Sequence, residues 1–484
     1  MEGPARRSPG NLFGLQTGAI ARAEAEKVPR PSPCTTGGGR CALRSVTGRA
    51  ALADEPRRRS PTLTGDLTPD HVRLRCRGCG TVYPPALQYA CPSCLGPLDA
   101  EYDAATLRER LDRASIEAGP RSIWRYADLL PSRPGPGDLA PGFTPLVPAP
   151  RLAEVLAVPG ELYLKDDTRN PTNSFKDRVV AVAAARARAF GLTTLACAST
   201  GNLAGATAAA AASQGMDCVV VVPADLEPAK IASAATFGAT VVAVEGNYDQ
   251  ANRLASQAAD AFGWGFVNVN LRPWYAEGSK TVGLEVAEQL GWSLPDHVVV
   301  PIASGALLTK VHQGFRVLAE HGLVEGTRFS VHGAQSDGCP PVARAFADWH
   351  DQVTPVKPSG IVKSLAIGDP ADGLEALEVV RSTGGRVEAV SDDEVVEAIR
   401  LLARTTGVFG ETAAGVTIAT TARLAAAGAL RRGERVVALV TGHGLKTMEV
   451  LDGRAGATVT VRPNIDALEE ALGPLAPHLL ASTG

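Results

Sequence analysis

Aromatic residues make up only 5% of this 484-residue sequence, and no apolar run approaches the roughly 20 residues that a membrane-spanning helix needs. The alanine-rich stretch at 203–213 is too short and too weakly apolar to cross a bilayer. The formal net charge is −3, which gives no reason to expect a nucleic-acid or membrane partner. Nine cysteines in so long a chain do not indicate a disulfide scaffold, and we expect a protein of the reducing cytoplasm.

Residues 1–65 differ in composition from the rest of the chain. Over residues 1–60 there are 11 Lys and Arg against 5 Asp and Glu, and no apolar period is sustained. We interpret residues 1–65 as a disordered basic leader. The alternative is a transit peptide, because arginine and serine are frequent, but four acidic residues disfavour it: Glu24, Glu26, Asp54 and Glu55.

The segment 120–455 begins with a loop rich in proline and glycine, after which short strand-like runs alternate with helical stretches. Strands are expected at 161–165, 194–198, 218–222, 240–244, 298–302, 330–334 and 436–440. Helices are expected at 203–213, 248–262, 279–290, 306–319, 393–404 and 413–427.

This alternation is typical of parallel sheets covered by helices on both faces. More than 300 residues are too many for one such sheet. We therefore predict an α/β fold with two lobes, parallel-rich sheets flanked by helices, and a site in the cleft between the lobes. Residues 456–484 form a C-terminal tail in this scheme.

Lys176 stands out because of its neighbours. It follows the turn signal Asn170-Pro171, and Ser174 is a suitable N-cap for a helix that begins near Phe175. A lysine in the first turn of a helix lies at the positive end of the dipole, which disfavours the ammonium form and favours a nucleophilic amine. A lone lysine is nonetheless usually a solvated surface charge, so the local sequence alone leaves the role of Lys176 open.

Three turns each come directly after a strand-like run, at residues 198–202, 301–306 and 441–446. Backbone N–H groups at the start of a helix bind anions such as phosphate or carboxylate. Taken singly, each turn is no more than an ordinary connection. Together with a lysine at a helix start, the three turns indicate an anionic cofactor.

The phrase Asn-Pro-Thr-Asn-Ser-Phe-Lys-Asp-Arg at 170–178, the Ser-Thr-Gly-Asn turn at 199–202 and Thr-Gly-His-Gly-Leu-Lys at 441–446 resemble the fold-type II enzymes that use pyridoxal phosphate (PLP), and specifically the threonine synthases. Phrases at 245–249, 275–281, 333–335 and 363–368 fit as well, so the resemblance runs from about residue 72 to residue 450. It implies conversion of O-phospho-L-homoserine and water to L-threonine and phosphate by γ-elimination and β-addition.

By this resemblance, Lys176 forms the Schiff base with PLP and later moves protons at the substrate carbons. Asn202 is expected to bind O3′ of the cofactor ring, and Thr441 to face the pyridine nitrogen. The loop that binds the PLP phosphate is expected at Ala303, Ser304, Gly305, Ala306 and Leu307. The substrate α-carboxylate is expected to bind at Ser199, Thr200 and Gly201.

The sequence departs from the family pattern at two places. Many members have a phosphate loop rich in glycine and asparagine, whereas residues 303–307 read Ala-Ser-Gly-Ala-Leu. Some relatives carry an arginine just before the Glu-Gly-x-Lys-Thr phrase, where this chain has Tyr275-Ala276. The nearby cations that we expect to bind the substrate phosphate are Arg272 and Lys280.

Residues 71–103 contain two CxxC pairs separated by eleven residues: Cys76 with Cys79, and Cys91 with Cys94. Four thiolates on two tight turns suit tetrahedral zinc, so we predict a zinc-ribbon-like module with a structural metal. The alternative is a ribbon of four reduced thiols that has lost its metal. Nothing here resembles a thioredoxin unit, which disfavours a redox role.

Two other functions stay open. One is a different PLP-dependent elimination or replacement enzyme of the same fold, such as cysteate synthase, a serine/threonine dehydratase or a specialised-metabolism paralogue. The other is a non-catalytic zinc-ribbon binding protein. We expect a small-molecule substrate, and because relatives of this fold are often dimers we also consider a homodimer.

Overall fold

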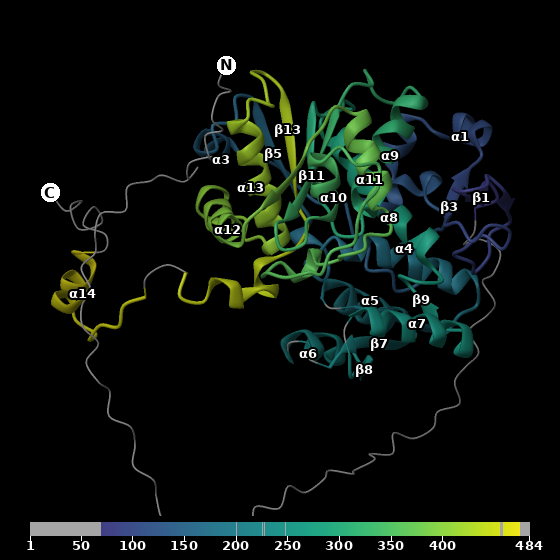
Figure 1. Ribbon diagram of the computed structural model, residues 1–484, viewed down its shortest axis with the longest axis horizontal. Helices are drawn as coiled ribbons and strands as arrows, with labels where there is room; N and C mark the ends of the chain where they lie inside the picture. The colour runs from purple at the N-terminus through teal and green to yellow at the C-terminus, as the bar shows by residue number, and fades with distance from the viewer. Residues whose placement is uncertain are drawn as a thin grey trace, which may run out of the picture. The chain divides into compact units, whose positions relative to one another are not determined.

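The computed structural model describes residues 69–199, 201–224, 226, 228–246, 248–454 and 458–474 (Figure 1). The leader expected at residues 1–65 and the expected carboxylate ligand Thr200 lie outside the described residues. Three sheets organise the described part of the chain: a three-stranded, a six-stranded and a four-stranded sheet.

The cysteine module is built on the small antiparallel sheet. Its strands lie in the order β2-β1-β3, with bounds β1 Val72–Cys76, β2 Val82–Tyr83 and β3 Leu98–Tyr102. Three short helices lead from it toward the large sheet: α1 Ala104–Arg110, α2 Arg113–Ala118 and the 3₁₀ helix η1 Ile123–Leu129. Aspartates cap the first two helices, since Asp103 accepts from the N–H of Thr106 at 2.8 Å and Asp112 from that of Ser115 at 2.9 Å.

The six-stranded sheet has the order β12-β11-β10-β13-β5-β4, and every neighbouring pair is parallel except β4 and β5. Its strands are β4 Leu146–Pro148, β5 Glu161–Asp166, β10 His297–Pro301, β11 Ser330–Ser336, β12 Val387–Val390 and β13 Arg435–Val440. Alternate side chains enter different cores: Val298 and Val300 face one apolar cluster, and Val299 faces another. Both faces of this sheet are therefore covered, as parallel sheets require.

Helices on each side supply the rest of those two cores. One cluster contains residues of α8 Arg272–Gln289, α9 Ala306–Glu320, α10 Pro341–Ala347 and α11 Gly373–Ser382. The other contains residues of α3 Pro150–Val155, α12 Asp392–Thr406 and α13 Thr412–Ala426. Helix α12 begins with a complete capping box, in which Ser391 and Glu394 each bind the other's backbone N–H.

The four-stranded sheet is entirely parallel, in the order β8-β7-β6-β9. Its strands are β6 Thr194–Ala198, β7 Asp217–Pro223, β8 Thr240–Val244 and β9 Gly265–Phe266, and its helices are α5 Asn202–Gln214, α6 Pro228–Thr236 and α7 Tyr248–Phe262. Leu195 and Cys197 pack with residues of α4 (Lys176–Ala189) and α5, while Ala196 and Ala198 pack with residues of α7.

Helices α4 and α8 pack closely together. A Cβ at Gly278 of α8 would lie 2.5 Å from the carbonyl oxygen of Arg178 in α4, so only glycine permits this approach. The sequence thus has a structural reason for glycine in the phrase at 275–281. The contact fixes the start of α4, where Lys176 lies, against the first turns of α8.

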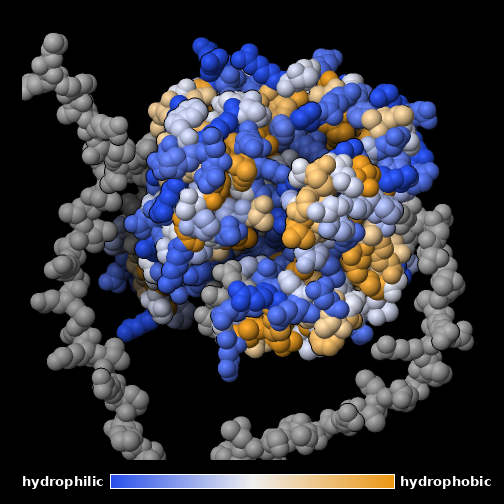
Figure 2. All heavy atoms as spheres, turned by 45° about the vertical axis from the view of Figure 1, so that its right-hand side comes forward, coloured by the Kyte–Doolittle hydropathy of each residue, from blue (hydrophilic) through white to orange (hydrophobic). Residues whose placement is uncertain are grey.

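The remaining elements are four 3₁₀ helices and one C-terminal helix: η2 Asp167–Arg169, η3 Lys363–Leu365, η4 Gly444–Lys446, η5 Met448–Leu451, and α14 Ile465–Leu472. Among the described residues, no helix has both the length and the apolar character needed to span a membrane. The face shown in Figure 2 is largely hydrophilic, with apolar residues in separate patches.

All seven strands expected from the sequence are present, which confirms the α/β prediction with parallel-rich sheets. Three short strands of these sheets were not anticipated: β4, β9 and β12. They have two to four residues each, so they are too short to show a period of two in the sequence.

Candidate active site

Lys176 is the first residue of α4, as the local sequence indicated, but the cap was assigned wrongly. The N-cap position is Phe175, which makes no side-chain hydrogen bond to the helix. Ser174 is fully buried, forms an isolated β-bridge with Gly442, and its hydroxyl has no hydrogen-bond partner among the described residues. A tertiary contact therefore replaces the expected local cap at this helix start.

The amine of Lys176 is half-buried among aromatic groups. Its Nζ donates to the hydroxyl of Tyr275 at 3.2 Å and lies 4.8 Å from the ring centroid of Phe175. Tyr275 belongs to α8, so the position at which some relatives carry arginine here contacts the candidate catalytic amine. The family resemblance identified Tyr275 as different from the arginine of some relatives, but it did not indicate this contact.

The strand-end turn at 441–446 lies beside the lysine. The N–H of Phe175 donates to the carbonyl of Thr441 at 2.8 Å, and the N–H of His443 donates to the carbonyl of Asn173 at 3.0 Å. Thr441 itself is buried. These bonds bring together two of the expected cofactor groups, Lys176 and Thr441, from segments far apart in the sequence.

Asn202 is the first residue of α5 and contacts a carboxylate that the sequence did not reveal. Its Nδ2 lies 3.0 Å and 2.9 Å from the two carboxylate oxygens of Glu411, which is buried. The N–H of Glu411 donates to the carbonyl of Gly442 at 2.9 Å. A Cβ at Gly442 would lie 2.3 Å from Oε1 of Glu411. Glu411 thus connects the Asn202 turn to the Thr441 turn.

The hydroxyl of Ser199 stabilises the turn that precedes α5. Its Oγ accepts from the N–H groups of Gly201 at 3.1 Å and Ala204 at 3.2 Å, and the residue is buried. The backbone of this turn is therefore held ready at the N-terminal end of α5, where partial positive charge favours an anion.

The loop at 303–307 opens α9 at Ala306. Gly305 is its N-cap residue, with φ of 97°, and a Cβ there would lie 2.4 Å from the carbonyl oxygen of Asp372. Both the left-handed backbone and the close approach require glycine. Leu307 lines a small cavity together with Phe175 and Thr441, so this loop reaches the same site.

The two cations expected to bind the substrate phosphate lie in different surroundings. Arg272 begins α8, is partly exposed, and forms an ion pair with Asp372 at 2.6 Å. Lys280 is fully buried, pairs with Glu277 at 2.6 Å and lies 4.1 Å from the ring centroid of Tyr102. The Lys280 ammonium thus belongs to a buried ion network, and Arg272 is the more accessible of the two predicted substrate ligands.

A second buried network anchors α4 behind Lys176. Arg178 has no exposed side-chain surface and binds Asp167 at 2.7 Å as well as Glu285, which also pairs with Lys165 at 2.6 Å. Burial alone would raise the pKa of Glu285, but Arg178 and Lys165 lower it to about 2. The carboxylate therefore stays charged and holds the helix in place.

Two further titratable groups lie near the lysine. Burial raises the pKa of Asp177 to about 6, although its carboxylate accepts from the N–H and the hydroxyl of Thr172 at 2.8 and 2.7 Å. Burial also lowers the pKa of Lys446, against the opposing effect of Glu411 and Asp177. The surroundings of Lys176 therefore contain groups whose charge is set by burial, as is common at functional sites.

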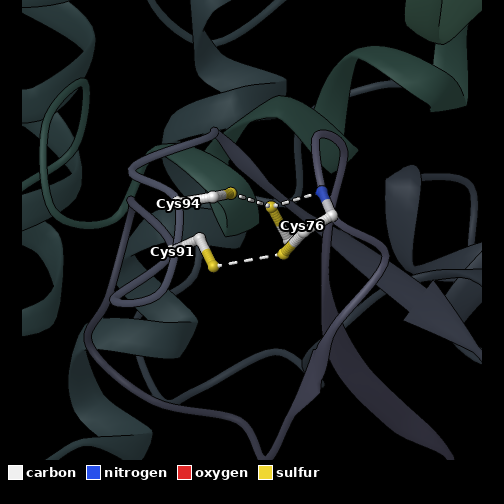
Figure 3. Close-up of side chains that lie close together, drawn as sticks. Cys76, Cys91 and Cys94 are labelled. Atoms are coloured by element: carbon white, nitrogen blue, oxygen red, sulfur yellow. Dashed lines mark hydrogen bonds between the residues drawn. The ribbon is translucent and has the colours of Figure 1, made fainter.

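The four cysteines of the module converge, as Figure 3 shows for Cys76, Cys91 and Cys94. Their sulfur atoms all lie within 4.8 Å of one another, with Cys76 to Cys94 at 3.4 Å and Cys79 to Cys91 at 3.6 Å. Zn–S bonds of about 2.3 Å in a tetrahedron place sulfurs about 3.8 Å apart. The donor set therefore fits one tetrahedral metal ion.

The residues around Lys176 likewise have the chemistry that PLP requires. An amine available to an aldehyde lies beside the turn at 441–446, and Glu411 connects that turn to Asn202. Leu307 of the loop at 303–307 lines a small cavity with Phe175 and Thr441. The loop at 303–307 leads into the N-terminus of the 15-residue helix α9, where backbone N–H groups suit a phosphate group.

A family model described as "Pyridoxal-phosphate dependent enzyme" matches residues 138–442. The threonine synthase of Methanosarcina acetivorans is 34% identical over 402 residues, which cover 82% of this chain and 98% of that protein. The threonine synthase of Methanocaldococcus jannaschii is 34% identical over 406 residues, which cover 83% of this chain and 99% of that protein.

Solved structures agree with this at the level of the fold. The processed form of threonine deaminase isoform 2 from Solanum lycopersicum aligns with a TM-score of 0.56 and 20% identity, covering 73% of this chain and 90% of that chain. Maize serine racemase aligns with a TM-score of 0.54 and 18% identity, covering 64% and 91%. The family and the cofactor expected from the sequence motifs are thus confirmed. The chain belongs to the threonine synthase family of pyridoxal-phosphate-dependent enzymes.

Proposed function

We propose that this chain converts O-phospho-L-homoserine and water to L-threonine and phosphate, as a carbon–oxygen lyase acting on phosphate. The observation that carries the proposal is the half-buried amine of Lys176, 3.2 Å from the Tyr275 hydroxyl and beside the turn that carries Thr441. Membership of the threonine synthase family supports the choice of substrate.

In this proposal the cofactor is held by segments that follow strands of both the four-stranded and the six-stranded sheet. Lys176 would bind the PLP aldehyde carbon through Nζ, Asn202 would bind O3′, and Thr441 would face the pyridine nitrogen. The phosphate group binds the loop Ala303, Ser304, Gly305, Ala306 and Leu307. When bound, PLP supplies the electron sink that makes the substrate Cα–H and Cβ–H bonds acidic.

Lys176 moves the protons. Once free of the cofactor, its Nζ would remove the proton from Cα, would give that proton up, and would then as a neutral amine remove one from Cβ. The Tyr275 hydroxyl, at 3.2 Å, holds this amine in place between the two transfers. The substrate carboxylate binds at the turn of Ser199, Thr200 and Gly201.

Arg272 binds the phosphate group that leaves from Cγ. Its guanidinium is partly exposed at the start of α8, one turn before Tyr275. An arginine binds phosphate by charge and by paired N–H donors. Holding the substrate by its phosphate would place Cα and Cβ within reach of Lys176. Bulk water must be excluded after phosphate departs and until one water has added at Cβ, because protonation in place of that addition would give 2-oxobutyrate.

The decisive experiment is a turnover assay of the purified chain with PLP. We expect phosphate release from O-phospho-L-homoserine with threonine in excess over 2-oxobutyrate, and much slower release from O-phospho-L-serine. Lys176→Ala should abolish turnover, and Arg272→Ala should raise KM with intact visible absorbance of bound PLP. Preference for phosphoserine would favour a paralogous replacement enzyme, and unchanged kinetics in Arg272→Ala would exclude that residue as the phosphate ligand.

We further propose that Cys76, Cys79, Cys91 and Cys94 hold a structural zinc ion in a cytoplasmic protein. The supporting observations are the sulfur distances and the absence of a disulfide among the cysteines of the described residues. Metal analysis of the purified chain should find one zinc per chain. The homodimer considered from the sequence stays a proposal, which light scattering can test.

A further inference from the structure

The arginine inside the first CxxC pair reaches away from the metal site toward the catalytic core. Arg77 binds Asp99 of its own module through Nε at 2.7 Å and Nη2 at 2.9 Å. Its Nη1 lies 3.0 Å from Oδ1 of Asp372 and 2.7 Å from Glu375. The module thus contacts the region around α11 through one guanidinium group.

Asp372 is the residue that receives this contact, and it is 2% exposed. Its other carboxylate oxygen, Oδ2, accepts from Arg272 at 2.6 Å. Its N–H donates to the carbonyl of Ser304 at 2.8 Å, and its own carbonyl oxygen lies against Gly305. One aspartate therefore contacts both groups that are proposed to bind phosphate: Arg272 for the substrate and the loop at 303–307 for the cofactor.

We propose that Asp372 is a positioning residue for phosphate binding. Arg77 of the cysteine module weakens the ion pair between Asp372 and Arg272 and so leaves Arg272 better able to bind phosphate. This inference rests on the proposed function, because it takes Arg272 as the ligand of the substrate phosphate. The cysteine module then completes the active site, in addition to stabilising its own fold.

The physical reason is competition for the Arg272 guanidinium. Asp372 orients Arg272 but also neutralises it, and an incoming phosphate must compete with that carboxylate. Arg77 shares the Asp372 charge through the opposite oxygen, which weakens the hold of Asp372 on Arg272. Without Arg77, Asp372 pairs with Arg272 alone, and Arg272 binds phosphate less well.

The chain offers a matched control in the same module. Arg75 binds Glu101 at 2.6 Å and the carbonyl of Gly80 at 2.9 Å, so both of its partners lie within the module. Its side chain is 48% exposed, against 21% for Arg77. Arg75→Ala therefore removes an arginine and an ion pair next to the cysteines without touching Asp372.

The experiment uses the full-length holoenzyme with Arg77→Ala, Arg77→Lys, Arg75→Ala, Arg272→Ala and the Arg77→Ala/Arg272→Ala double variant. We expect Arg77→Ala to raise KM for O-phospho-L-homoserine about tenfold with kcat within about twofold, from the loss of one charge-assisted contact. Arg75→Ala should leave both constants within about twofold. In the Arg272→Ala background, Arg77→Ala should raise KM by less than a further factor of about two, because both residues act on the same ligand.

A second readout separates this proposal from the proposed function. The dissociation constant of inorganic phosphate, measured by calorimetry on each holoenzyme, should rise in Arg77→Ala and stay unchanged in Arg75→Ala. If Arg77→Ala fails to fold, Arg77→Lys serves in its place. Lysine retains the charge but not the paired N–H donors of the guanidinium, so we expect a smaller rise in the dissociation constant of phosphate. Equal behaviour of the Arg77 and Arg75 variants, or additive effects with Arg272→Ala, would overturn the inference even if the chain turns over phosphohomoserine. Absence of that turnover, with the phosphate effect intact, would instead reject the substrate.

Discussion

Replacing Glu411 by alanine should weaken PLP binding without removing any group proposed to touch the cofactor. The carboxylate accepts from Nδ2 of Asn202 at 3.0 and 2.9 Å and is 3% exposed. In the native chain this contact directs the amide of Asn202, the proposed ligand of the PLP O3′. In Glu411→Ala the amide is free to rotate, and part of its contact with the cofactor is lost.

The size of the effect follows from the kind of bond. A hydrogen bond to a charged group contributes about 1.5–3 kcal/mol. If the misoriented Asn202 amide costs about 2 kcal/mol of the free energy of PLP binding, the dissociation constant for PLP rises about 30-fold, since about 1.4 kcal/mol corresponds to a factor of ten. Glu411→Gln keeps an acceptor oxygen at the same place, so we expect less than about a fivefold rise.

The assay is a titration of PLP into the cofactor-free chain, followed by visible absorbance of the bound cofactor. Glu397→Ala is the control, because Glu397 pairs only with Arg400 and Arg404 on α12, at 2.8 and 2.7 Å, among the described residues. Glu397→Ala should bind PLP like the native chain. The reasoning would be refuted if Glu411→Ala also bound PLP within twofold of the native chain, or if alanine and glutamine were equally harmful.

Three other variants test the surroundings of the site. Glu285→Gln leaves Arg178 and Lys165 buried with one carboxylate charge fewer. The free energy of unfolding, measured in urea, should therefore fall by about 3–5 kcal/mol. A loss below about 1 kcal/mol would contradict the stabilising role of this network. Burial raises the pKa of Asp177 to about 6, so the folded chain binds this proton more tightly than the unfolded chain and loses stability as pH rises from about 4 to about 6. Asp177→Asn should therefore gain stability relative to the native chain across that window, and a difference that does not vary with pH would oppose the assignment. Cys94→Ser should retain less zinc in metal analysis and melt at a lower temperature; a full zinc content would argue against the four-cysteine site.

The sequence alone predicted much of the fold and the general position of the site. Strand-like runs and the turns after them are local signals, and the turns expected at 301–306 and 441–446 do follow strands β10 and β13. The roles of individual site residues came from the family resemblance and stay predictions. Local signals misled where a tertiary contact took over. Ser174 forms a bridge with Gly442 instead of capping α4.

Other parts of the site depend on contacts between distant segments. Asn202 and Glu411 are 209 residues apart in the sequence, and Arg77 and Asp372 are 295 apart. No composition or period in a single sequence marks such a pair. Glu411 stands before an alanine-rich helix and Arg77 stands inside a metal-binding motif, where each has an ordinary local explanation.

Near-neighbour chemistry was therefore determined by the sequence: apolar alternation, glycine at tight turns, paired cysteines, and a lysine at a helix start. Only the tertiary structure decided which of these groups meet and which charges are neutralised. The physical reason is that burial and ion pairing depend on distances through space, so Lys280 is withdrawn into the core while Arg272, eight residues earlier, remains partly exposed beside Asp372.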